Sequence, residues 1–330
     1  MATLSSPAGW RPLPTRPIDP DESIRWGCSG KGWNCCTDKV IPVRPYDIVR
    51  LRHAVRQPSE WLINNQYVTF VWDGSGAFVG YLGQVAYERT RKACVFYEEV
   101  TNVRAREIRD RDPERFVTLP DHVRRSADSI AAGEWRVAGL CNAHQNRPEA
   151  CRGFPFQRDP AREQREHESP VLQVFSCGTC ALSTPTTPRA VMADNQLEPY
   201  WRADDALLEV MRYLHSLGAS KLKHADYTAL AIGDNARAEL WASMYAPDNN
   251  AAIVTAFPEQ WRSELDVAGD AAIYRMLLEQ VMDRTDALVA GSSVDPATLG
   301  VRDAPLRARP DLDRLMDPAR ELFLPVVHAT

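Results

Sequence analysis

Cysteine is the residue type whose number and spacing most clearly indicate chemistry in this sequence. The chain holds eight cysteines, all within its first 180 residues. They are Cys28, Cys35 and Cys36, then Cys94, then Cys141 and Cys151, and finally Cys177 and Cys180. Thiolates bind zinc and iron–sulfur clusters, and eight of them would fill two four-thiolate sites. We therefore interpret all eight as candidate metal ligands.

The first three cysteines lie in the polar stretch 28–36, which also holds two glycines. Such a stretch has little apolar surface to keep it folded, and metal binding would supply the missing stabilisation. Neighbouring side chains point to opposite faces of a strand, or about 100° apart on a helix, so one ion would rarely bind both Cys35 and Cys36. A polynuclear centre suits this pair, which favours an iron–sulfur cluster over zinc.

The strongest local half-site is Cys177-x-x-Cys180, because this spacing lets two sulfurs converge on one ion. The alternative is a thioredoxin-type redox pair, which needs a helix that begins at the cysteines. Pro185 and Pro188 follow too soon for such a helix, and this favours the metal half-site.

Other side chains near the cysteines are secondary candidates. His144, between Cys141 and Cys151, is a candidate ligand in place of a cysteine, although a lone histidine is more often a surface residue. Four cations could offset the negative charge of a thiolate site, with chance proximity as the alternative in an arginine-rich chain. These cations are Arg25, Lys31, Arg147 and Arg152.

Composition excludes several classes of function. A formal net charge of −5 argues against a nucleic-acid partner, which would require a large basic face. No apolar run approaches the roughly 20 residues that cross a bilayer, and the N-terminus lacks the features of a secretory signal. We expect a cytoplasmic protein, in which clustered cysteines indicate metal or redox chemistry rather than disulfides. Phosphate-loop, nucleophile-elbow, zinc-protease and dinucleotide motifs are absent from the sequence.

The fold that must position these residues is predicted to be α+β and mostly helical. We expect an extended, proline-rich arm over residues 1–20, a cysteine-cluster metal-binding domain over 21–190, and a helical region over 191–330. The cysteine domain should be irregular, with one small β-hairpin. The helical region either supports that domain, caps it or recruits a partner, and the sequence does not choose among these roles.

Several local elements are predicted within the cysteine domain. Residues 40–43 indicate an edge strand, residues 45–56 a helix, and Ser59 the cap of a second, short helix. Alternating apolar residues between 67 and 87 predict a hairpin that turns at Gly74-Ser75-Gly76.

Further elements follow along the chain. The mixed charges of residues 102–128 indicate a solvated helical face or an insertion. Pro148 and Pro155 bracket a turn or one short helix, residues 171–175 form a candidate strand, and residues 183–188 look like a linker. Helical spacing then predicts three helices, over 206–217, 237–245 and 271–289.

Two blocks of residues make the chain similar to a known family, the YkgJ-type cysteine-cluster proteins, described as a zinc- or iron-chelating domain. The first block holds the early cysteines, Ile41 and a helix, and the second holds the later cysteines. The matching residues are Cys28, Cys35, Cys36, Ile41, Asp47-Ile48-Val49-Arg50-Leu51, Gly139-Leu140-Cys141, Arg147-Pro148-Glu149-Ala150-Cys151-Arg152 and Phe154-Pro155-Phe156. The resemblance covers roughly residues 25–180 and implies metal chelation.

The resemblance also has a departure and leaves alternatives open. The family's second cysteine falls at Gly32, so Cys94, Cys177 or Cys180 must complete a full site. The leading interpretation is a protein with one or two iron–sulfur clusters, or zinc, that transfers electrons or positions a small-molecule or protein substrate. A related family, the flagellin lysine methylases, implies an iron–sulfur and S-adenosylmethionine enzyme that modifies protein side chains. The third interpretation is a zinc scaffold without catalysis.

Overall fold

A computed structural model describes residues 15–25, 36–72, 78–129, 133–158, 172–175, 185–216, 245, 267–291 and 307–319. This part of the chain is mixed α+β and mostly helical, as the sequence predicted. Its strands pair antiparallel in five small sheets within the described ranges, and the two longest described helices begin at Glu198 and Val267. Four of the eight cysteines, Cys28, Cys35, Cys177 and Cys180, lie outside the described residues.

The predicted hairpin and edge strand form one sheet. Its three strands run in the order β3-β5-β4, and β4 pairs with β5 from Val68 opposite Leu82 to Trp72 opposite Phe78. Both predictions are confirmed, while the predicted turn at residues 74–76 lies outside the described residues. The strands are β3 (Pro42–Val43), β4 (Val68–Trp72) and β5 (Phe78–Leu82).

Two helices, α1 (Pro45–Val55) and α2 (Ser59–Asn64), confirm the predicted helical segments. Pro45 occupies the first turn of α1, where its missing N–H costs nothing. The prediction of Ser59 as a cap is wrong by one residue. Pro58 is the N-cap, no side chain caps α2, and Ser59 is already helical and fully buried.

The hairpin of β6 (Gln84–Ala86) and β7 (Lys92–Cys94) follows β5 and carries Cys94 at its end. Gly83 joins β5 to β6 and donates its N–H to the Tyr67 carbonyl over 2.8 Å. A Cβ atom at Gly83 would lie 1.9 Å from the Gln66 carbonyl oxygen, so only glycine permits this close approach of two backbones. The position of Cys94 therefore depends on this contact.

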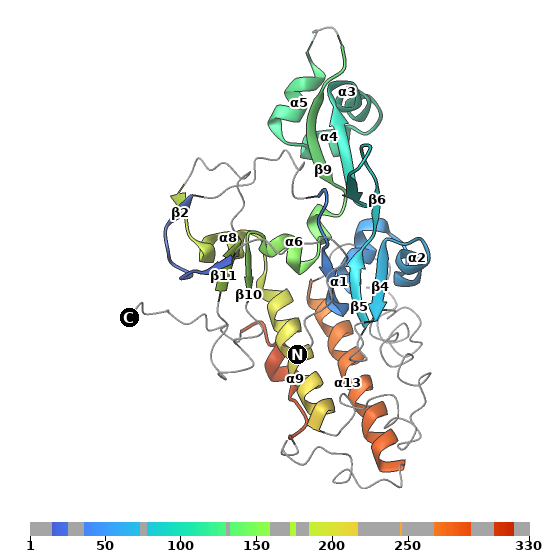
Figure 1. Ribbon diagram of the computed structural model, residues 1–330, viewed down its shortest axis with the longest axis vertical. Coiled ribbons are helices and arrows are strands. Elements are labelled where there is room, and N and C mark those ends of the chain that lie inside the picture. Colours follow the sequence, from blue (N-terminus) through green and yellow to red (C-terminus); the bar gives the residue numbers. More distant parts are fainter. Residues whose placement is uncertain are drawn as a thin grey trace.

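Residues 97–141 form a small module with its own apolar core, which projects at one end of the molecule (Figure 1). Its helices carry paired charges on their outer faces and pack with apolar side chains against a two-stranded sheet. Residues 102–128, predicted as a solvated helical face or an insertion, therefore also contribute to an apolar core. Its elements are β8 (Tyr97–Thr101), α3 (Asn102–Arg111), α4 (Pro113–Thr118), α5 (Asp121–Ala127) and β9 (Arg136–Cys141).

The middle of the chain holds short elements around the second cysteine block. Pro148 and Pro155 bracket one short helix, α6, and the predicted strand at 171–175 is β11. The linker prediction for 183–188 is partly wrong, because β12 pairs with β2 and Pro188 starts α8, which Thr187 caps. These elements are β1 (Thr15–Pro17), β2 (Ile24–Arg25), η1 (His144–Asn146), α6 (Glu149–Gly153), β10 (Phe156–Arg158), β11 (Leu172–Phe175), β12 (Pro185–Thr186) and α8 (Pro188–Asp194).

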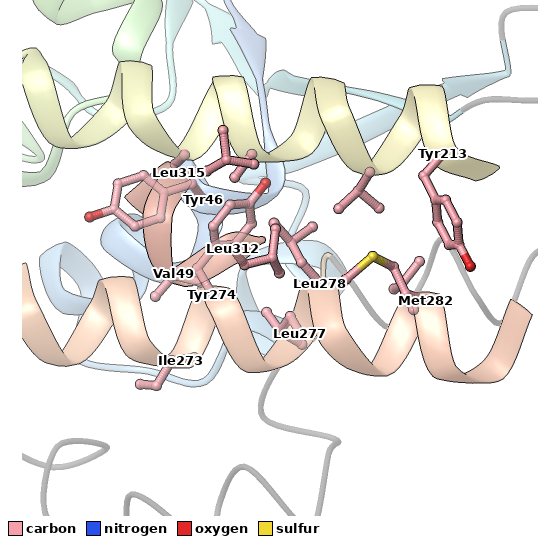
Figure 2. Packing of buried hydrophobic residues seen from close by; sticks show 14 of the residues in the cluster. Tyr46, Val49, Tyr213, Ile273, Tyr274, Leu277, Leu278, Met282, Leu312 and Leu315 are labelled. Carbon is pink, nitrogen blue, oxygen red and sulfur yellow. The ribbon is translucent and has the colours of Figure 1, made fainter. Parts of the chain in front are cut away.

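The largest apolar core lies between α1 and three C-terminal helices. Helices α9 (Glu198–Ser216) and α13 (Val267–Gly291) run side by side, with α14 (Leu312–Met316) against them (Figure 1). Figure 2 shows Tyr46 and Val49 of α1 meeting Tyr274, Leu277 and Leu278 of α13. The predicted helices at 206–217 and 271–289 are thus confirmed and are longer than expected, and the described C-terminal helices support α1.

Two findings complete the description of the helices. Of the predicted helix at 237–245, the structure describes Tyr245 alone. None of the described helices is both long enough and apolar enough to cross a membrane.

Candidate functional site

Three separate segments bring the four described cysteines to one region. Cys36 accepts a hydrogen bond at its carbonyl oxygen from the N–H of Cys94, over 2.7 Å. Cys141, at the end of β9, pairs with Tyr97 at the start of β8, only three residues after Cys94. Cys151 lies in α6, and Cys94, Cys141 and Cys151 all pack against the same apolar cluster. The fold thus gathers residues that are up to 115 positions apart in the sequence (from 36 to 151).

The thiols affect one another electrostatically. Burial raises the pKa of Cys151 well above its usual range, and negative charge on Cys141, Cys94 and Cys36 raises it further. Burial, together with Cys141, raises the pKa of Cys94 to about 11. Four thiolates would therefore repel one another unless a positive centre stabilises them. A metal ion supplies that stabilisation, because it binds the deprotonated form.

The described cysteines nevertheless do not form a finished ligand set. Within the described ranges, no three His, Cys, Asp or Glu side chains are grouped so that they could hold a metal ion. Cys94, Cys141 and Cys151 carry free thiols. Sulfur donors have the right chemistry for iron–sulfur clusters or zinc, but the described cysteines do not by themselves complete a site.

The secondary candidates have distinct surroundings. Partial burial of the ring, together with the charges of Arg147 and Arg152, lowers the pKa of His144 to about 4. Arg25 lies in β2 and is exposed, while Lys31 lies outside the described residues. Burial and the charge of Arg152 lower the pKa of Arg147, and negative charge on Cys141 or Cys151 opposes this shift.

Comparison with protein-family models, with curated proteins and with solved structures gives no match for this chain.

Two carboxylates, Asp47 and Asp204, are largely removed from solvent, and the sequence did not predict their burial. Asp47, in the first turn of α1, accepts backbone N–H groups from Arg44 and Glu149, both over 2.8 Å. Arg44 pairs with Asp204 of α9. Burial raises the pKa of Asp47 to about 7, and the two N–H bonds oppose this shift only in part. Burial also raises the pKa of Asp204, against the charge of Arg44.

We expect the pKa of Asp47 to make stability depend on pH. The native state keeps a proton on Asp47 that the unfolded chain releases between about pH 4 and pH 7. The free energy of unfolding should therefore fall as pH rises through this window, at a slope that approaches about 1.4 kcal/mol per pH unit. The measurement is urea unfolding at several pH values, with Asp47→Asn as the comparison.

The variant should show a smaller fall than the wild type across this window, whatever its absolute stability. Asp204 titrates in the same direction and remains in both proteins, so the difference between the two curves reports Asp47 together with its interaction with Asp204. Parallel curves would show that Asp47 does not hold a proton in the native state.

A second buried ionic group joins α1 to α13. Asp270 is 2% exposed and accepts hydrogen bonds from Arg50 over 2.6 Å and from Arg52 over 3.2 Å. Its carboxylate also lies 2.9 Å from Nε2 of His53. Burial alone would raise the pKa of Asp270, but the hydrogen bond from His53 and the charges of Arg50 and Arg52 lower it. No local pattern in the sequence signals this group, because its partners lie about 220 residues apart (|i−j| of 217 to 220).

Proposed function

We propose that this protein binds metal through its cysteines, as one or two iron–sulfur clusters in the first instance and as zinc in the second. The observation that carries the proposal is that Cys94, Cys141 and Cys151 pack against one apolar cluster, and that the backbone of Cys36 is hydrogen-bonded to that of Cys94. Thiols gathered in this way repel one another when they are ionised, and a bound metal cation would offset this repulsion and stabilise the folded state. An iron–sulfur cluster, when bound, would transfer electrons or provide a binding point for a substrate.

The remaining cysteines would complete the ligand set. Two described residues near them in the sequence lie opposite each other, since Arg25 of β2 pairs with Pro185 of β12. In the sequence, Cys28 lies three residues after Arg25 and Cys180 lies five residues before Pro185. Cys35 directly precedes Cys36, and such a pair suits a polynuclear centre. This supports iron–sulfur over zinc.

The proposal includes a cytoplasmic location, where thiols remain reduced and available to metal. It also retains the similarity to the YkgJ-type proteins, which is supported by a contact between the two blocks of that pattern: the N–H of Glu149 donates to Asp47 over 2.8 Å. The substrate, if there is one, would be a small molecule or a protein side chain.

Anaerobic purification followed by analysis of iron, zinc and acid-labile sulfide tests the proposal. We expect a coloured protein with iron and sulfide in equal amounts, close to four of each per cluster for the four-iron type. A colourless protein with stoichiometric zinc and no sulfide would replace the iron version with the zinc version. A chain that binds neither metal, even after reconstitution under reducing conditions, would refute the proposal.

The same preparation separates the alternative functions. Heat of S-adenosylmethionine binding to the metal-loaded protein, measured by calorimetry, would favour the enzyme that modifies protein side chains. Zinc without heat or redox activity, with loss of structure on chelation, would favour the zinc scaffold.

A further inference from the structure

A short segment near the C-terminus, residues 307–319, lies against α9 and α13, and we call it the strap. Helix α14 forms its middle, and most of its other residues are exposed. Figure 2 shows its two buried side chains, Leu312 and Leu315, in the core between α9 and α13. They are 1% and 8% exposed, and Met316 packs beside them. Little apolar surface therefore holds the strap in place.

The guanidinium of Arg309 joins the strap to three carboxylates of α13. Its Nη2 lies 2.6 Å from Glu279 and 2.7 Å from Asp283, and its Nη1 lies 3.1 Å from Asp286. The three acids follow one another at helical spacing, so they share one face of α13 and repel one another. One cation of the strap therefore offsets the repulsion among three acids of the helix beneath it.

Further polar contacts attach the strap at its two ends and in its middle. The N–H of Arg307 donates to Oγ of Ser216 over 3.2 Å, and Nη2 of Arg202 donates to the carbonyl of Pro318 over 2.9 Å. Asp313 of α14 pairs with α13 at an exposed position. Salt screens exposed ion pairs but not apolar contacts. The ionic part of this attachment therefore depends on ionic strength, while the leucine anchor does not.

We propose that the strap is a salt-sensitive conformational device, in which residues 307–319 open and close as one unit and Arg309 is the latch on α13. Segments with few buried apolar contacts and exposed polar contacts are the ones that open locally while the rest of a protein stays folded. Opening would expose the apolar seat of Leu312 and Leu315, which belongs to the same core as Tyr46 of α1. The proposal does not depend on metal binding.

The test is amide hydrogen exchange of the full chain, followed in peptides that cover the strap. The N–H groups of Arg314 and Leu315 donate to Asp311, to its Oδ1 over 3.0 Å and to its carbonyl over 3.1 Å, so their exchange reports opening. We expect these amides to exchange before those of α13. Their exchange should be faster at about 500 mM than at about 10 mM sodium chloride, because salt screens the latch.

Arg309→Gln removes the latch from an exposed position, since the side chain of Arg309 is 37% exposed. At low salt its strap should exchange about fivefold faster than that of the wild type, the change that about 1 kcal/mol produces. The variant should also lose most of the salt dependence. Arg309→Lys keeps the charge but not the planar fork, so its exchange should lie between the two.

The matched control is Arg109→Gln. The side chain of Arg109 is 39% exposed and pairs with Asp110 over 2.9 Å and with Asp128 over 3.0 Å, in the module of residues 97–141. It should leave the exchange of the strap at the wild-type rate at both salt concentrations. Leu312→Ala shortens the apolar anchor, so it should speed exchange while keeping the salt dependence of the wild type.

Two results would overturn the proposal. In the first, the strap of the wild type exchanges only as slowly as α13, which would mean that it opens only when the whole core unfolds. In the second, Arg309→Gln keeps both the exchange rate and the salt dependence of the wild type, which would mean that Arg309 is not a latch. Neither result bears on the proposed metal binding.

Discussion

Asp270→Ala is expected to lower the free energy of unfolding by about 3–5 kcal/mol, as measured by urea denaturation. The variant removes the carboxylate that pairs with Arg50 and Arg52, whose side chains are both 4% exposed. Arg50 would then remain buried without its carboxylate partner, and the cost of that unpaired charge dominates the change. His53 loses the same carboxylate, which it approaches within 3.0 Å at both oxygens.

The matched control is Asp313→Ala. Asp313 pairs with Arg275, which lies on α13 as Asp270 does. The side chain of Asp313 is 77% exposed, so its removal should cost only about 0–1 kcal/mol. Equal losses in the two variants would mean that solvent reaches the Asp270 group and that the ion pairs contribute little.

The position of α1 explains why this ionic group concerns the candidate site. One face of α1 carries Tyr46 and Val49 into the core shared with α9 and α13. The other carries Ile48 and Leu51 into the cluster that Cys94, Cys141 and Cys151 pack against. A helix buried on both faces transmits any displacement from one core to the other. Asp270 therefore fixes, through α1, the wall against which the cysteines lie.

The sequence predicted the elements whose signal is local. The helix at 45–56 has a proline at its start and an apolar face, the hairpin at 67–87 alternates, and both are confirmed. Boundaries were less accurate where tertiary contacts decide them. Thr186 pairs with Ile24 across more than 160 residues, so β12 could not be distinguished from a linker by its own composition.

The candidate site was predictable in its residue type but not in its arrangement. Cysteine spacing indicated a set of ligands, yet the meeting of Cys36 with Cys94 and of Cys141 with Cys151 depends on how β7, β8, β9 and α6 pack. The buried charges were not predictable. Asp47 resembles any acidic residue in the first turn of a helix, and its burial arises from α6, about 100 residues later (|i−j| of 102 for the Glu149 contact).

Replacing a described cysteine by serine should remove a metal centre altogether. Cys36→Ser, Cys94→Ser, Cys141→Ser and Cys151→Ser each exchange a soft sulfur ligand for a hydroxyl that neither iron–sulfur clusters nor structural zinc prefer. If these four residues serve one centre, each variant should lose the same share of metal and sulfide per chain, as measured after anaerobic purification. Variants of Cys28, Cys35, Cys177 and Cys180 then show whether those residues serve the same centre or a second one.

The control must separate loss of a ligand from damage to the core. Ala143 is 2% exposed and belongs to the cluster that the cysteines pack against, so Ala143→Ser buries a hydroxyl in the same place, at a cost of about 1–3 kcal/mol. It should be less stable than the wild type but keep its full metal content. The four serine variants could also keep their full metal content. That result would show that these thiols only pack in the core, because loss of a metal ligand should reduce the bound metal.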